Sequence, residues 1–229
     1  EEDAILLALR KATEGNCDLL TFMPRRIAKC VAEKLMFPFI DWAIFCWLPM
    51  SQAHKRKNPY LSATYGQFML FKRLAYEQIG GHSRVKDNAV DDMELGRMTK
   101  REGLVWSLLD GGGLVTSLPY ENNVDALKGI SRSVFPALNY HVSLLVAFSI
   151  LLLAIAYIPL YNFISEVISD QFSTGFFYLS LFSLSMLVIS WAFVCVRFKH
   201  PKYLVILFPV SITLVVLVAY YSMFANVME

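Results

Sequence analysis

The stretch GQFMLFKRLAYEQIGGHSRVKDNAVDDMELGRMTKREGLVWSLLD, residues 66–110, alternates strand-like apolar runs with helical segments. Gly80 and Gly81 end the first helical segment, and Gly103 ends the second, because glycine readily closes a helix at its carboxyl end. The stretch therefore predicts a domain that mixes strands and helices. The expected elements are strands at 66–73 and 104–110 and helices at 74–79 and 91–102.

The flanking sequence adds further elements of both kinds. We expect helices at 3–14, at 25–35 and from Asn123 onward, and strands at 18–22 and 114–118. The helix from Asn123 is amphipathic and is expected to lie along a membrane surface.

Two segments before residue 60 leave alternatives open. MFPFIDWAIFCWLPM, residues 36–50, is too short to span a bilayer. Its tryptophans suit a membrane interface, and a buried core helix explains it equally well. HKRK, residues 54–57, is a basic loop that meets lipid headgroups or a diphosphate, or is simply solvated.

Three apolar runs follow, at 142–164, 175–196 and 203–225. None contains a charged residue, and each reaches the roughly 20 residues that a spanning helix needs. Of the 21 Lys and Arg in the chain, only Arg197, Lys199 and Lys202 follow residue 141. The sequence therefore predicts three membrane-spanning helices.

The loop charges predict how these helices are oriented. The loop between the first two runs carries Glu166 and Asp170, whereas the next loop, RFKHPK (197–202), is basic. Lys128 and Arg132 precede the first run. The positive-inside rule then predicts a multi-pass protein of the cell membrane, with residues 1–140 in the cytoplasm and the carboxyl terminus outside.

Composition excludes several classes of function. The net charge of +2 argues against a nucleic-acid partner. The four cysteines lack the paired spacing of a zinc site or a disulfide framework. Spans without charged residues argue against a transporter or channel component.

Two adjacent carboxylates, Asp91 and Asp92, open the expected helix at 91–102. Asp91 and Glu94 have the spacing of a capping box, which is a structural role. Asp92 would then take the first helical position, where the helix dipole favours the ionised carboxylate. An ionised carboxylate at the mouth of a cleft is suited to act as a general base.

These segments together resemble the family 2 glycosyltransferases, in their membrane-bound, processive-synthase-like branch. The resemblance is strongest to carotenoid-acid glycosyltransferases of the diaponeurosporenoate type, which also end in several spans. Asp91 stands where the family usually has Glu. The matching residues are Gly66, Gln67, Arg73, Tyr76, Gly80, Gly81, His82, Asp92, Leu95, Arg97, Lys100 and Gly103.

The resemblance implies a partial nucleotide-diphosphosugar transferase fold of the GT-A type, a mixed α/β sheet, followed by three transmembrane helices. Residues 1–120 would form the acceptor-side half of the catalytic domain, 121–140 the interfacial helix, and 141–229 the membrane region. The implied activity is inverting transfer of a hexose from a nucleotide-sugar donor to a lipid or other membrane-associated acceptor.

The resemblance also implies roles for single residues. Asp92 would be the general base, and Asp91 would support the helix start. Gly66, Gln67, His82 and Arg97 would bind substrate. From residue type alone, Gln67 is equally well explained on an exposed strand. A His after Gly-Gly more often simply fills a turn, which is the alternative for His82.

Two departures from the family pattern matter. The family holds Mg or Mn with an Asp-x-Asp motif, and no Asp-x-Asp occurs in this chain. We therefore expect the metal ligands, and the nucleotide-binding half, to lie upstream. Leu118 precedes Pro119-Tyr120 where relatives often carry an Arg. Both departures keep open the alternative of a catalytically inactive membrane scaffold or partner subunit.

Overall fold

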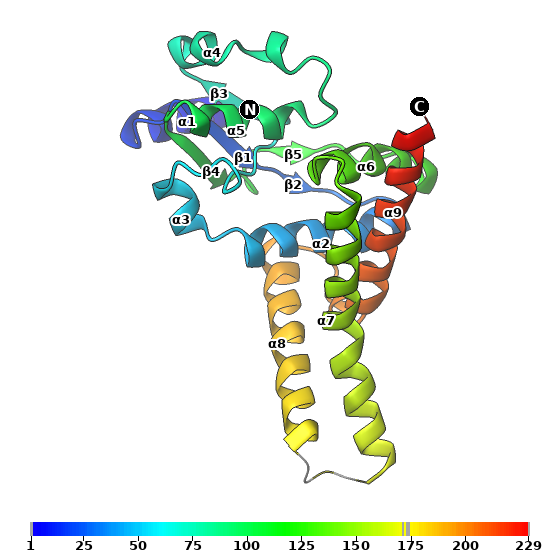
Figure 1. Ribbon diagram of the computed structural model, residues 1–229. Helices are drawn as coiled ribbons and strands as arrows, with labels where there is room; N and C mark the ends of the chain where they lie inside the picture. The colour runs from blue at the N-terminus through cyan, green and yellow to red at the C-terminus, as the bar shows by residue number, and fades with distance from the viewer. Residues whose placement is uncertain (1, 171, 173–174, 229) are drawn as a thin grey trace. The chain divides into compact units, whose positions relative to one another are not determined.

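The structure is a computed structural model that describes residues 2–170, 172 and 175–228 (Figure 1). The described residues combine many helices with two small sheets, so the prediction of a mixed α/β chain is confirmed at that level. The chain divides into two units. The first comprises Glu1–Ile27 with Ile44–Pro119, and the second comprises Ala28–Ala43 with Tyr120–Glu229.

A three-stranded sheet of order β3-β1-β4 forms the centre of the first unit. β1 (Leu19–Met23) is buried along its whole length. It pairs antiparallel with β3 (Met69–Phe71) and parallel with β4 (Trp106–Asp110). A separate parallel pair joins β2 (Arg25–Arg26) to β5 (Thr116–Ser117).

Alternating side chains of the sheet supply two apolar clusters, as the two-residue period of a strand requires. On one face, Leu20, Phe22 and Leu70 pack with Ala8 of α1 (Glu2–Glu14). On the other face, Met69 and Phe71 pack with residues of α4 (Arg73–Ile79) and α5 (Asp91–Arg101). Figure 1 shows α1 and β1 in blue and the α4–α5 region in green.

α3 (Met50–Lys55) covers the outer side of β4. The Nε2 atom of His54 lies 3.2 Å from the Leu108 carbonyl oxygen and 3.3 Å from the Leu108 nitrogen. The imidazole therefore occupies backbone positions that another strand would otherwise use. His54 and Lys55 belong to a helix rather than to the basic loop that the sequence predicted.

The helix expected at 25–35 is wrong in its first part. Arg25 donates its N–H to the Val115 carbonyl, 2.8 Å away, and enters the β2–β5 pair. The helix α2 instead spans Val31–Trp47 and includes Pro38. The conformation of Arg25 thus depends on a distant segment of the chain. The local pattern of apolar residues could not predict it.

Buried Glu33 fixes the start of α2 in the second unit. Its carboxylate accepts hydrogen bonds from the N–H groups of Lys29 (2.7 Å), Cys30 (3.0 Å) and Tyr120 (2.7 Å). Burial works to raise the pKa of Glu33, but the N–H donors outweigh it, and the pKa is lowered. Glu33 therefore remains a charged acceptor and ties α2 to the segment before α6.

Residues 36–43 of α2 are packed against the apolar helices of the second unit, which favours the core interpretation for this part. Met36 contacts Val215 and Val218. The Trp42 ring stacks on Trp191, and its indole N–H donates to Ser190 Oγ at 3.0 Å.

A buried ionisable pair adds a second tie to α2. The Asp41 carboxylate lies 2.7 Å from Nε2 of His200, in the loop after α8.

The three predicted apolar runs are helices, each long and apolar enough to cross a membrane. They are α7 (Val142–Ile168), α8 (Gly175–Arg197) and α9 (Phe208–Met228). The third begins five residues later than expected, because Lys202–Val205 forms a short 3-10 helix, η2. Gln171, Ser173 and Thr174 of the predicted acidic loop lie outside the described residues.

The direction of α9 differs from the alternating arrangement that the loop charges predicted. α7 and α8 form an antiparallel hairpin, in which Phe163 stacks on Phe177. The Tyr157 hydroxyl lies 2.8 Å from Thr213 Oγ1, and Leu145 packs with Ala219. α9 is therefore antiparallel to α7 and runs in the same direction as α8 (Figure 1).

The last turns of α9 are held by α6 (Asn123–Ala137). The Ser222 hydroxyl accepts the Phe135 N–H at 3.1 Å and donates to the Ser131 carbonyl. It thus stands between a donor and an acceptor that would pair directly in a regular helix. The end of α9 consequently lies at the same end of α7 as α6 does.

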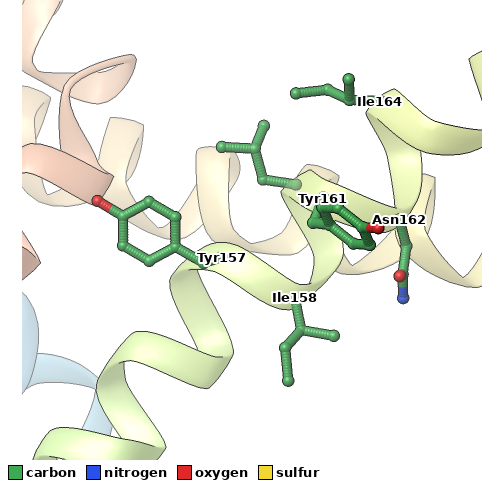
Figure 2. Close-up of a pocket in the computed structure, with 6 residues that line it drawn as sticks. Tyr157, Ile158, Tyr161, Asn162 and Ile164 are labelled. Atoms are coloured by element: carbon green, nitrogen blue, oxygen red, sulfur yellow. The ribbon is translucent and has the colours of Figure 1, made fainter. Parts of the chain in front are cut away.

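The second half of α7 extends past the start of α9. A pocket of about 650 Å³ lies there. Figure 2 shows Tyr157 pointing away from Tyr161 and Asn162. Its lining comes from α7 alone: Tyr157, Ile158, Leu160, Tyr161, Asn162 and Ile164. Such an open, largely apolar helix face suits contact with lipid tails.

We expect the end of α9 to face the cytoplasm, together with Lys128 and Arg132 of α6. A fluorescent protein fused after Glu229 should fluoresce in a bacterial inner membrane, and an alkaline phosphatase fused there should be inactive. The same reporters placed after Phe172, between α7 and α8, should behave oppositely. An active phosphatase at the carboxyl end would instead support three alternating spans.

Substitution of Glu33 should destabilise the second unit. Glu33→Gln leaves buried N–H groups facing an amide, and unsatisfied buried donors cost about 1–3 kcal/mol each. Thermal unfolding of the purified protein should therefore shift downward at neutral pH, while Glu121→Gln, an exposed neighbour of Tyr120, should change stability by less than about 0.5 kcal/mol.

The pH dependence gives a second readout for the same variant. The pKa of Glu33 is lowered in the folded protein. Ionised Glu33 therefore makes its full contribution to the free energy of unfolding at pH values above the pKa of Glu in the unfolded chain. That contribution is lost as the pH falls through the folded value, so wild type and Glu33→Gln should converge in acid. A constant difference at all pH values would contradict this role of Glu33.

Candidate functional site

A tight turn positions Gly66 and Gln67. The Phe68 N–H donates to the Tyr65 carbonyl at 3.1 Å, so Gly66 and Gln67 occupy the two central positions of the turn. Gln67 is exposed there, and is not part of a strand as the sequence predicted. β3 begins only at Met69.

Thr21 of β1 forms hydrogen bonds to both ends of this turn. The sequence alone did not identify this residue. Its Oγ1 accepts the Tyr65 N–H at 3.0 Å and lies 2.9 Å from the Phe68 carbonyl oxygen. Thr21 is fully buried. A polar residue inside the apolar strand LLTFM was the available signal, because buried hydroxyl groups require partners.

Asp92 meets the turn at the start of α5. Its Oδ2 accepts the Gly66 N–H at 2.9 Å, and its Oδ1 accepts the Met93 N–H at 2.7 Å. A Cβ at position 66 would lie 3.3 Å from Oδ2, so a side chain there would crowd the carboxylate. Two of the motif segments, 26 residues apart, are thus joined at one carboxylate.

The electrostatic environment of Asp92 differs from the predicted one. Burial raises the pKa of its carboxyl, and the N–H groups of Gly66 and Met93 oppose this effect without cancelling it. The negative charge of Asp91 also raises the pKa. The effect of the helix dipole on Asp92 therefore does not dominate. The Asp92 carboxylate is more basic than that of an ordinary Asp, which suits proton abstraction.

The predicted capping box does not form. The N-cap of α5 is Val90, so Asp91 is the first helical residue and Asp92 the second. Asp91 Oδ1 accepts the Asp92 N–H at 2.9 Å. The Glu94 carboxylate does not reach back but pairs with Arg101 at 2.6 Å and Arg97 at 3.4 Å. A supporting role of Asp91 at the helix start stays a prediction.

Arg97 is buried, and its guanidinium pairs with Glu94 at 3.4 Å. It lies five positions after Asp92, which places the two side chains on different sides of a helix with 3.6 residues per turn. Substrate binding by Arg97 stays a prediction.

His82 is held by Tyr76. The Tyr76 hydroxyl lies 2.8 Å from His82 Nδ1 and accepts the His82 backbone N–H at 3.0 Å. Gly81 has a φ of +55°, and a Cβ there would lie 2.5 Å from the Tyr76 ring. The motif Tyr-x₃-Gly-Gly-His thus builds one exposed imidazole with a fixed orientation, and its role in binding stays a prediction.

Lys100 connects α5 to the basic segment at 54–57. Its buried ammonium donates to the carbonyls of Ala53 and Arg56 and lies 4.7 Å from the Trp106 ring centre. Burial lowers its pKa to about 8. The side chains of Lys55, Arg56 and Lys57 remain exposed. Lys100 therefore helps to position the basic surface formed by Lys55, Arg56 and Lys57, but its own ammonium is buried beneath that surface.

A divalent metal has no ready site among these residues. Within residues 2–170, 172 and 175–228, no three His, Cys, Asp or Glu side chains gather as a metal-binding group. The residues present thus do not fit the Mg or Mn that the resemblance implies, and ligands upstream of this chain stay a prediction.

Comparisons of the chain with protein-family models, with curated proteins and with solved structures find no match. The resemblance to family 2 glycosyltransferases therefore rests on the motif residues of the sequence.

Proposed function

We propose that this chain is the acceptor-side part of an inverting, membrane-bound glycosyltransferase that moves a sugar from a nucleotide-diphosphosugar to a lipid-embedded acceptor. The observation that carries the proposal is the hydrogen bond between Gly66 and Asp92. It joins the Gly-Gln and Asp-Asp segments, which the resemblance selects independently, at one partly buried carboxylate of raised pKa.

In the proposed reaction, the Asp92 carboxylate takes the proton of an acceptor hydroxyl or carboxyl group. The acceptor oxygen then attacks the anomeric carbon and forms the new C–O bond, while the bond to the diphosphate oxygen breaks. The diphosphate leaves with the electron pair, and a single displacement inverts the anomeric centre. The Gly66 N–H orients the carboxylate, so that proton transfer requires little reorganisation.

The membrane region supports a lipid acceptor. Three helices are long and apolar enough to cross a bilayer, and they carry no charged residue except at the ends of α7 and α8. A catalytic domain tied to such helices stays at the surface where a lipid-borne nucleophile is presented. The exposed aromatic residues Phe45 and Trp47 of α2 suit the same interface.

The test is Asp92→Asn, introduced into the gene so that any upstream residues are retained. Removal of a general base should lower sugar transfer by about 100-fold or more. Membranes from cells that make the variant should be incubated with labelled nucleotide-sugars, and the lipid extract should be counted. Asp87→Asn, an exposed carboxylate in the preceding loop, is the matched control and should retain activity.

Amounts of protein in the membrane, measured by immunoblot, should be equal for wild type and both variants. Near-normal transfer by Asp92→Asn would overturn the assignment of the base. If wild type transfers no sugar from any donor offered, and the Asp92→Asn variant complements a deletion strain, the inactive-scaffold alternative is supported instead.

A further inference from the structure

A groove runs along the line where α6 and α9 meet in the second unit. It has a volume of about 300 Å³, near the lower end for small-molecule sites. Val218 is buried at its base, whereas Val124, Leu217 and Tyr221 are about half exposed. Its lining residues are Val124, Leu127, Lys128, Leu214, Leu217, Val218 and Tyr221.

The groove segment of α9 runs beside the first half of α7. Ala219, within this segment, packs with Leu145 in the first turn of α7. Thr213, just before the groove, bonds to Tyr157 further along α7. Because α7 is long and apolar enough to cross a membrane, the groove would then lie near the depth where headgroups meet acyl chains.

The groove carries positive charge. Among the described residues, Lys128 is the one charged residue of its lining, and it is exposed. Arg132 follows one turn later on the same side of α6. The nearest acidic residue of α6, Asp125, accepts a hydrogen bond from the Asn122 side chain at 2.7 Å, at the helix start. An apolar groove lined by a cation complements a chain with an anionic head.

We propose that this groove is a binding site for an anionic phospholipid, with one acyl chain between α6 and α9 and the phosphate group at Lys128. The site is independent of sugar transfer, because none of its residues belongs to the first unit. The lipid would hold the α6–α9 pair together in addition to the Ser222 hydrogen bonds.

The test uses the purified full chain in nanodiscs that contain phosphatidylglycerol with a photoreactive diazirine in one acyl chain. After irradiation, mass spectrometry of peptides should locate adducts at Leu214, Leu217 or Tyr221. Leu217→Trp fills the groove and should remove most of these adducts. Val210→Trp, at a lipid-exposed position of α9 outside the lining, is the matched control and should leave them unchanged.

Charge is tested separately. Lys128→Gln should reduce groove adducts of phosphatidylglycerol by about five-fold, the factor expected for one Lys near an anionic surface. It should not change adducts of a phosphatidylcholine that carries the same diazirine chain. Lys202→Gln, an exposed lysine of η2, is the control for general loss of charge.

Adducts spread evenly over α7, α8 and α9, with no response to Leu217→Trp or Lys128→Gln, would overturn the proposal and indicate annular lipid only. Circular dichroism and gel filtration should show that each variant is folded. If Leu217→Trp is not, Val124→Trp fills the groove from the opposite wall and replaces it in the test.

Discussion

The hydrogen bond from the Gly66 N–H to Asp92 Oδ2 is the contact on which the proposed chemistry depends. It orients a carboxylate whose pKa burial has raised, and it exists only because the turn at 65–68 is itself fixed. That turn rests on Thr21, in the central strand of the sheet. A chain of hydrogen bonds thus runs from the buried core of the first unit to the candidate base.

In the second unit, too, hydrogen bonds position distant segments of the chain, here in apolar surroundings. The helices of this unit carry few polar groups, and two of the buried ones connect elements distant in sequence. Glu33 accepts a hydrogen bond from the Tyr120 N–H, and the Ser222 hydroxyl enters the hydrogen-bond ladder of α6. Hydrogen bonds in a low-dielectric interior are stronger, and an unpaired group there is costly. These contacts, more than hydropathy, decide where α2 and α9 lie.

The sequence was informative where local pattern decides the structure. Runs of uncharged apolar residues predicted the start of α7 and, to within one residue, both ends of α8, and Gly80 and Gly103 marked the ends of α4 and α5. The sequence pattern failed to predict the structure where contacts with distant residues determine it. Arg25 pairs with a strand 91 positions away, and the direction of α9 follows from Tyr157 and Ser222 rather than from its composition.

For the same reason, the sequence predicted some residues of the candidate site and missed others. Motif spacing selected Gly66 and Asp92 without indicating that they touch, and it did not select Thr21, whose role appears only when β1 and the turn come together. Arg97 was expected to bind substrate; it pairs with Glu94 in α5, and substrate binding stays a prediction. A motif indicates that certain residues matter. Only their contacts in the structure distinguish a residue that stabilises the fold from one that is placed for the reaction.

The central claim is that the Asp92 carboxylate removes the acceptor proton, and the pH dependence of sugar transfer in isolated membranes tests it most directly. Since burial raises the pKa of Asp92, and only the ionised form accepts a proton, the rate should fall in acid. The midpoint should lie above the pKa of an ordinary Asp and should move in Asp92→Glu. A rate that stays constant down to the pKa of an unperturbed carboxyl would contradict the account.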